Sequence, residues 1–142
     1  MNFNFIEKLN KSQKIRFYLN RIVDLDKKIE LIISTISLTK EDEKLYLFLK
    51  FWQEDTSIID ELKKNEINII HHKKYLGDEE AGGLACEITL VNSDFIHQLL
   101  LCHFNYETGG EPYLNIRPYF VLNESKIIID IYDDRGFDIY CR

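Results

Sequence analysis

Four aspartates near the C-terminus are the residues of this chain best suited to chemistry, and they are Asp130, Asp133, Asp134 and Asp138. Carboxylates bind hard cations, and two carboxylates that share a buried site can act as an acid and a base, because each charge raises the pKa of the other group. Asp130 and Asp138 flank a predicted turn, so we expect them to approach across neighbouring strands. A small metal-dependent or acid/base hydrolase using this cluster is therefore one alternative function.

The same segment also has a structural interpretation that needs no ligand. Asp133 and Gly136 occupy the first and fourth positions of a predicted type I turn, where Asp bonds the following amides and Gly tolerates a positive φ. Arg135 between them would pair with a neighbouring aspartate at the surface. We favour this interpretation for the loop.

Histidine and cysteine pairs give weaker signals of chemistry. His71 and His72 are adjacent in a predicted strand, so their side chains point to opposite faces and do not chelate one ion together. Cys102 and His103 are neighbours on a predicted helix and diverge by about 100°. The chain contains no nucleophile elbow, P-loop, dinucleotide-binding glycine motif or HExxH motif. We therefore expect no enzyme activity, no metal and no cofactor.

Charge is distributed unevenly along the chain. Residues 1–75 contain 14 Lys and Arg against 12 Asp and Glu, whereas residues 76–142 contain 4 against 12, so the two parts carry +2 and −8 and the total is −6. An anionic surface attracts cationic partners and repels nucleic acid and anionic lipid. We expect a basic protein partner, no nucleic acid and no membrane. The oligomeric state stays open, and a scaffold that dimerises through an apolar surface is a further alternative.

Length and composition indicate one domain that spans residues 1–142. The chain lies within the usual single-domain range, and 45% of its residues are hydrophobic, enough to bury a core. No stretch approaches the roughly 18 apolar residues that a membrane span needs, and the first residues lack the basic and apolar regions of a secretion signal. We expect a cytoplasmic protein.

Apolar periodicity and turn residues predict an α+β fold. The expected sheet is mixed, carries three to four helices, and ends in a C-terminal antiparallel three-strand meander. The run after residue 44 is apolar on both sides, which places that strand in the middle of the sheet. The predicted helices lie over residues 3–9, 24–38, after 55 and from 93, and the predicted strands over 15–19, 45–52, 67–71, 86–90, 113–122, 126–132 and 137–141, with a flexible loop at 76–83.

Several segments of the chain resemble a known bacterial family. These segments are 15–19, 43–52, 119–123 and 129–138, and the last contains the run Tyr132-Asp133-Asp134-Arg135-Gly136-Phe137-Asp138. Together they resemble an uncharacterised domain-of-unknown-function family whose chains end in a Tyr-Asp-Asp-Arg-Gly-x-Asp hairpin. The resemblance implies, by analogy, an immunity protein that accompanies a polymorphic or contact-dependent bacterial toxin. It carries over no catalytic residues.

Charge and resemblance lead to one functional hypothesis, which is that the chain binds and neutralises a toxin domain, a basic nuclease, through an acidic surface. An acidic face can occupy the cationic cleft that a nuclease uses to hold phosphate, and aromatic side chains near the acids would anchor the complex. Tyr106, Tyr119 and Tyr132 are aromatic candidates. The predicted partner-binding residues are Asp78, Glu79, Glu80, Glu107, Glu111, Tyr113, Asp133, Asp134, Arg135 and Phe137.

Overall fold

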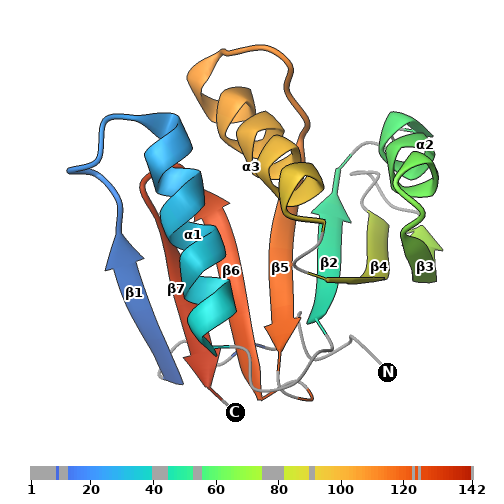
Figure 1. Ribbon diagram of the computed structural model, residues 1–142, viewed down its shortest axis with the longest axis horizontal. Helices are drawn as coiled ribbons and strands as arrows, with labels where there is room; N and C mark the ends of the chain where they lie inside the picture. Colours follow the sequence, from blue (N-terminus) through green and yellow to red (C-terminus); the bar gives the residue numbers. More distant parts are fainter. Residues whose placement is uncertain are drawn as a thin grey trace.

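One sheet and three helices make up the described part of the chain (Figure 1). The computed structural model describes residues 9, 13–39, 45–52, 56–74, 82–89, 92–122, 124 and 126–141. The helix predicted over residues 3–9 lies outside them except for its last residue. In chain order the elements are β1 (Lys14–Tyr18), α1 (Leu25–Thr39), β2 (Leu45–Phe51), α2 (Thr56–Lys64), β3 (Asn68–Lys74), β4 (Gly82–Ile88), α3 (Ser93–Thr108), β5 (Ile116–Leu122), β6 (Ile127–Asp133) and β7 (Gly136–Cys141).

The seven strands follow the spatial order β1-β7-β6-β5-β2-β4-β3. Every neighbouring pair is antiparallel, so the α+β class is confirmed while the sheet is purely antiparallel where a mixed one was expected. The C-terminal meander β5-β6-β7 is confirmed. β2 lies between β4 and β5, inside the sheet, as its apolar residues on both faces predicted. The first strand, β1, closes one edge by pairing with the last strand, β7.

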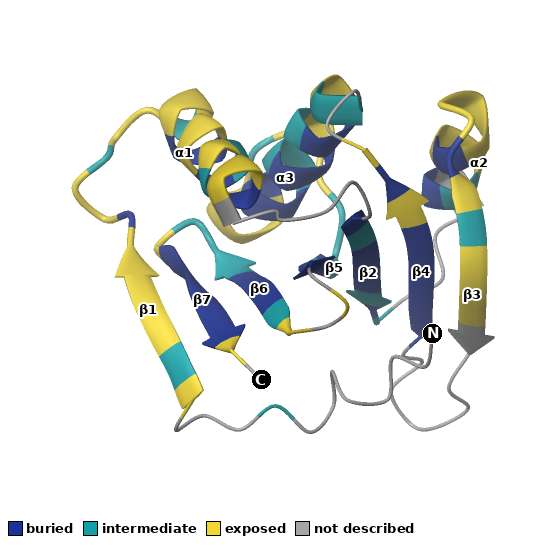
Figure 2. Cartoon of the chain, turned by 60° about the horizontal axis from the view of Figure 1, so that its bottom comes forward, coloured by how far each residue is buried: buried dark blue, intermediate teal, exposed yellow. Residues whose placement is uncertain are grey.

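The helices begin where local sequence signals place them, and all three lie on one side of the sheet (Figure 2). Asp24 caps α1, since its Oδ1 accepts hydrogen bonds from the backbone N–H groups of Asp26 at 2.9 Å and Lys27 at 3.4 Å. α3 ends at Thr108, and Gly109 directly after it adopts the left-handed conformation with φ of 80°. None of the helices in the described ranges is long and apolar enough to cross a membrane.

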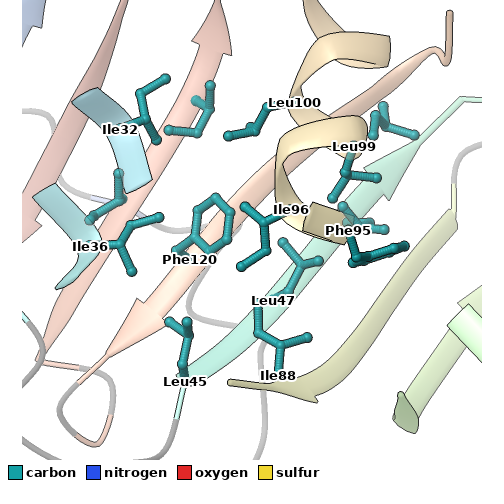
Figure 3. Close-up of a cluster of buried hydrophobic side chains, with 14 of the residues drawn as sticks. Ile32, Ile36, Leu45, Leu47, Ile88, Phe95, Ile96, Leu99, Leu100 and Phe120 are labelled. Atoms are coloured by element: carbon teal, nitrogen blue, oxygen red, sulfur yellow. The ribbon is translucent and has the colours of Figure 1, made fainter. Parts of the chain in front are cut away.

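The main hydrophobic core lies between the helices and the sheet. Figure 3 shows Ile32 and Ile36 of α1 and Ile96 of α3 above Leu47 of β2 and Phe120 of β5. These five side chains are 0% exposed. Because strand residues alternate between faces, Leu45, Leu47 and Leu49 of β2 all belong to this core.

A second, smaller core covers the face of the sheet opposite the three described helices. It contains Phe48, Ala85, Tyr119, Val121, Ile128 and Tyr140, against which Leu9 and Tyr46 pack. Gly83 belongs to β4, although the sequence indicated a loop there; residues 76–81 of that loop lie outside the described residues. A Cβ at Gly83 would lie 2.8 Å from Cζ of Phe48, so glycine makes room for this ring.

Candidate functional site

Asp130 and Asp138 lie opposite each other on β6 and β7, as the turn between them predicted. Each carboxylate is buried, with 2% of the residue exposed, and each accepts two hydrogen bonds from one arginine. Arg117 bonds Asp130 at 2.9 and 2.7 Å, and Arg16 bonds Asp138 at 2.8 and 3.1 Å. Lys14 Nζ lies 3.6 Å from the Asp138 carboxylate. The charges of both acids are therefore compensated within the fold.

The environment of this pair shifts several pKa values. Burial raises the pKa of Asp130, and the nearby Asp138 charge adds to the increase, while the bonds from Arg117 oppose it. Burial likewise raises the pKa of Tyr119 and of Tyr140, both of which are also close to the Asp130 charge. The arginines hold the carboxylates as ion pairs. Ion pairing by itself explains why two charged side chains are buried in the sheet, and no catalytic role is needed to explain them.

The aspartates of the β6–β7 turn are paired as well. Asp133 accepts bonds from Arg135 Nε at 2.9 Å, Nη2 at 2.6 Å and the Arg135 backbone N–H at 2.8 Å. Burial alone would raise the pKa of Asp133, but these bonds and the Arg135 charge outweigh it and lower the pKa. Asp134 lies 3.7 Å from Nζ of the buried Lys28, which also donates to the Asp134 carbonyl at 2.9 Å. This turn is therefore not an open anionic patch, in contrast to the sequence-based expectation.

Two other predictions about the hairpin need correction. Phe137, a predicted contact residue, is 1% exposed and stacks on Phe17 of β1 with ring centroids 5.1 Å apart, so its ring is not available to a partner. Gly136 does not adopt the positive φ expected of it. A Cβ at this position would instead collide with the Phe17 carbonyl oxygen, so glycine is needed for the close approach of β1.

Three of the predicted contact residues are exposed together at the end of α3. Glu107 belongs to its last turn, and Glu111 and Tyr113 follow in the connection to β5. The Tyr113 ring lies 6.0 Å from that of Tyr106, and the two residues are 58% and 43% exposed. Within the described ranges, neither glutamate has a cation at ion-pair distance. Asp78, Glu79 and Glu80 lie outside the described residues.

The connection that carries these residues is anchored to α3 by three hydrogen bonds. The buried Asn105 donates from Nδ2 to the Pro112 carbonyl at 2.9 Å. The N–H of Gly110 bonds the Asn105 carbonyl at 3.0 Å, and the N–H of Leu114 bonds the Cys102 carbonyl at 3.1 Å. The exposed tyrosine pair is thus held in place before any partner binds.

Each tyrosine of the pair lines a different hollow. Tyr106 contributes to an open hollow of about 310 Å³, here called the polar hollow, and Tyr113 to one of about 450 Å³, the apolar hollow. The polar hollow is lined by Trp52, His103, Tyr106, Glu107, Asn115, Ile116, Arg117 and Tyr132. The apolar hollow is lined by Ile58, Glu61, Phe95, Gln98, Leu99, Cys102, Pro112, Tyr113 and Leu114. α3 and the connection to β5 thus contribute lining residues to both hollows.

The buried His103 side chain lies near the ends of β5 and β6 that are not paired with each other. Pairing of β5 with β6 runs from Leu122–Ile127 to Tyr119–Asp130 and ends there. The imidazole is 4% exposed, interacts with the backbone of Ile116 and Ile131, and has a pKa lowered to about 4 by burial, which outweighs those backbone interactions. Its Nε2 is the single buried side-chain N or O atom among the described residues that has no hydrogen-bond partner. His103 is therefore neutral at pH 7.

The family is identified by sequence comparison. Residues 33–142 match the model of a domain of unknown function, DUF3885. The chain belongs to this family. The match includes the β6–β7 hairpin and the whole end of α3 with its tyrosine pair. Neither the curated proteins nor the solved structures contain a match to the chain.

The remaining candidate ligands in this DUF3885 chain do not converge. His71 and His72 are both exposed on β3, and the three cysteines are separate, with Cys86 buried, Cys102 partly buried and Cys141 exposed. Burial raises the pKa of the Cys102 thiol, which makes the reactive thiolate less available. No group of three or more His, Cys, Asp or Glu that could hold a metal ion occurs within the part of the chain that the structure describes.

Sequence reasoning missed Trp52 and Arg117 as parts of a site. Trp52 directly follows β2, and Arg117 is the one charged residue of the otherwise apolar strand β5. A lone arginine in an apolar strand is a signal for a buried acidic partner, and the partner here is Asp130. The neighbourhood of these two residues with Tyr106 and Glu107 arises only from packing of α3 beside the end of the sheet.

Proposed function

We propose that this DUF3885 protein is an immunity-type inhibitor that binds and neutralises a bacterial toxin domain with a basic surface. The contact surface in this proposal is the tyrosine pair, Tyr106 and Tyr113, together with Glu107 and Glu111. One observation carries it, namely two large aromatic side chains that are exposed beside two acids for which the described residues supply no cationic partner. Tyrosine is enriched among the residues that dominate binding energy at protein interfaces.

The surroundings of the tyrosine pair support a protein partner. Each of the two exposed aromatic rings lines a hollow, so the surface combines large aromatic side chains with recesses that can receive side chains of a partner. The anchored connection after α3 lowers the conformational entropy that association would otherwise cost. Both features favour a preformed binding surface over a catalytic cleft.

The charge of the chain supports a basic partner. Residues 76–142 carry a net charge of −8, although the aspartates of the β6–β7 hairpin are compensated by cations from other strands, from α1 and from Arg135 in the turn itself. Glu107 and Glu111 lie beside aromatic side chains that can exclude water from the contact. Acids in this setting speed association with a positively charged protein and select against acidic competitors.

The test uses the effector domain encoded in the neighbouring reading frame, co-expressed with this chain. We expect co-expression to protect cells from that domain, and the two purified proteins to form a complex whose affinity falls with rising salt. Tyr113→Ala should weaken the complex by about 2 kcal/mol. Charge reversal by Glu107→Lys or Glu111→Lys should slow association.

Glu87→Lys is the matched control, since Glu87 is an exposed acid on β4, away from the tyrosine pair. Failure of the chain to protect cells would refute the immunity function. Protection with unchanged affinity in all three variants at the end of α3 would place the contact surface elsewhere.

A further inference from the structure

The polar hollow next to the tyrosine pair has the composition of a site for a flat cation. Its volume of about 310 Å³ lies at the lower end of the range for ligand pockets and suits one side chain better than a large cofactor. Three of its residues are aromatic, namely Trp52, Tyr106 and Tyr132. Aromatic faces attract cations, and the planar guanidinium group also stacks on them.

The charges around the polar hollow favour a positive ligand. Glu107 is exposed and has no ion-pair partner among the described residues. Arg117, the one cation in the wall, uses Nε and Nη2 to bind Asp130, so its charge is compensated inside the protein. Two further cations lie against aromatic rings of the wall without lining the hollow: Lys50 Nζ is 5.9 Å from the Trp52 ring centroid, and Arg16 Cζ, whose charge is compensated by Asp138, is 5.0 Å from the Tyr132 ring centroid. Tyr106 is therefore the aromatic residue of the wall for which the described residues show no cation against the ring. The wall as a whole therefore retains one uncompensated negative charge, that of Glu107.

A second observation is a buried polar atom without a hydrogen-bond partner in the same wall. His103 forms part of the wall, is 4% exposed, and its Nε2 makes no hydrogen bond. A neutral imidazole has one nitrogen that accepts a hydrogen bond, and leaving such a group unpaired in the interior costs free energy. The Asn115 side chain adds another hydrogen-bonding group to the same wall.

We propose that the polar hollow binds the guanidinium group of an arginine side chain on the partner protein, with aromatic rings against its faces and Glu107 as its carboxylate acceptor. The inference rests on the proposed function, which supplies the protein that carries the arginine. A guanidinium fits better than an ammonium, because it is planar, less strongly hydrated and able to bond a carboxylate with two N–H groups.

The experiment uses the full chain and a small arginine probe, so it does not depend on the toxin. Trp52 is the one tryptophan in the sequence, so its fluorescence reports directly on the wall of the hollow. At constant ionic strength, N-acetyl-arginine amide should cause a saturable fluorescence change, with a dissociation constant on the order of millimolar. The citrulline analogue has the same shape without the charge, and it should bind at least about tenfold more weakly.

Variants of the two neighbouring glutamates complete the test. Glu107→Gln should weaken binding of N-acetyl-arginine amide about fivefold or more, whereas Glu111→Gln should leave it unchanged, because Glu111 does not line the hollow. Unchanged circular dichroism would show that both variants are folded. No saturable signal, equal binding of the citrulline or lysine analogue, or equal effects of the two variants would each overturn the proposal.

The outcomes separate this inference from the proposed function. A chain that neutralises its toxin but does not bind N-acetyl-arginine amide would refute the arginine site alone. A chain that binds the probe through Glu107 but gives no protection against the toxin would refute the immunity function and leave the cation site standing.

Discussion

The guanidinium of Arg16 and the carboxylate of Asp138 are 122 residues apart in sequence and form a two-bond pair across β1 and β7, at 2.8 and 3.1 Å. Directly beside it, Arg117 and Asp130 form the same kind of pair between β5 and β6. Because Asp130 and Asp138 are opposite each other, two like charges would meet in the sheet without their arginines. One pair therefore joins β1 to β7 and the other joins β5 to β6, and the two pairs meet where Asp130 and Asp138 lie opposite each other.

We predict that Arg117→Met destabilises the protein by leaving the buried Asp130 without its counter-charge. The cost in free energy of unfolding at pH 7 should be about 2 to 3 kcal/mol, below the usual value for a buried pair because Arg117 is partly exposed. Urea denaturation would measure it. Arg135→Met is the matched control, because the Arg135–Asp133 pair is exposed, and its denaturation midpoint should not change.

If Arg117→Met destabilises the protein through the unpaired charge of Asp130, removing that charge should reduce the loss of stability. Adding Asp130→Asn to Arg117→Met should restore part of the lost stability, since the unpaired charge is then gone. The penalty of Arg117→Met should also shrink at acidic pH, where Asp130 becomes protonated and neutral. Equal destabilisation at all pH values would contradict this explanation and indicate lost packing instead.

We predict that His103 makes the protein less stable in mild acid. Its pKa is about 4 in the folded state against an ordinary value of 6.5, so the unfolded chain binds more protons between these values and stability falls as pH decreases through this window. The full loss is at most about 3 kcal/mol. Denaturation from pH 7.5 to 4 would measure it, with His103→Gln as the variant that should lose this part of the pH dependence. Parallel curves for the two proteins would contradict the prediction.

Gly136→Ala should detach β1 from the sheet, because the new Cβ would collide with the Phe17 carbonyl oxygen. We expect a loss of about 2 to 3 kcal/mol, typical of overpacking. Hydrogen exchange should show faster exchange of β1 amides than of β2 amides. The control is Gly109→Ala, where φ is 80° and a Cβ would have no neighbour within 4 Å; it should cost about 1 kcal/mol and leave β1 protected. Similar exchange in both variants would argue against the collision.

Asn105→Ala should loosen the connection that carries Glu111 and Tyr113. It removes the Nδ2 bond to the Pro112 carbonyl from a residue that is 8% exposed, at a cost of about 1 to 2 kcal/mol. Asn65→Ala removes a comparable bond of 2.8 Å to the Glu61 carbonyl on the surface and should change stability by less than about 0.5 kcal/mol. Thermal or urea unfolding would compare them, and equal effects would show that the connection is held by other contacts.

Local features of the fold followed from neighbouring residues. The cap at Asp24, the turn between Asp133 and Gly136, and the approach of Asp130 to Asp138 depend on residues a few positions apart, whose side chains act on the nearest backbone. The same is true of β2, because apolar residues on both faces identify an inner strand whatever its neighbours are. These predictions are confirmed, except that Gly136 does not adopt the positive φ expected in the turn.

Contacts between residues far apart in the sequence determined which charges of the hairpin are compensated and which of its side chains are buried. The sequence offered Asp134 as a contact residue, whereas Lys28 reaches it from α1, and it gave no sign that Arg16 of β1 pairs with Asp138. It offered Phe137 as a contact residue, whereas Phe17 covers it. Strand alternation gives the face on which a side chain lies but not which distant strand becomes its neighbour. Contacts between β1 and β7, or between α3 and the end of β2, exist only once non-local strands have paired and the helices have packed on them.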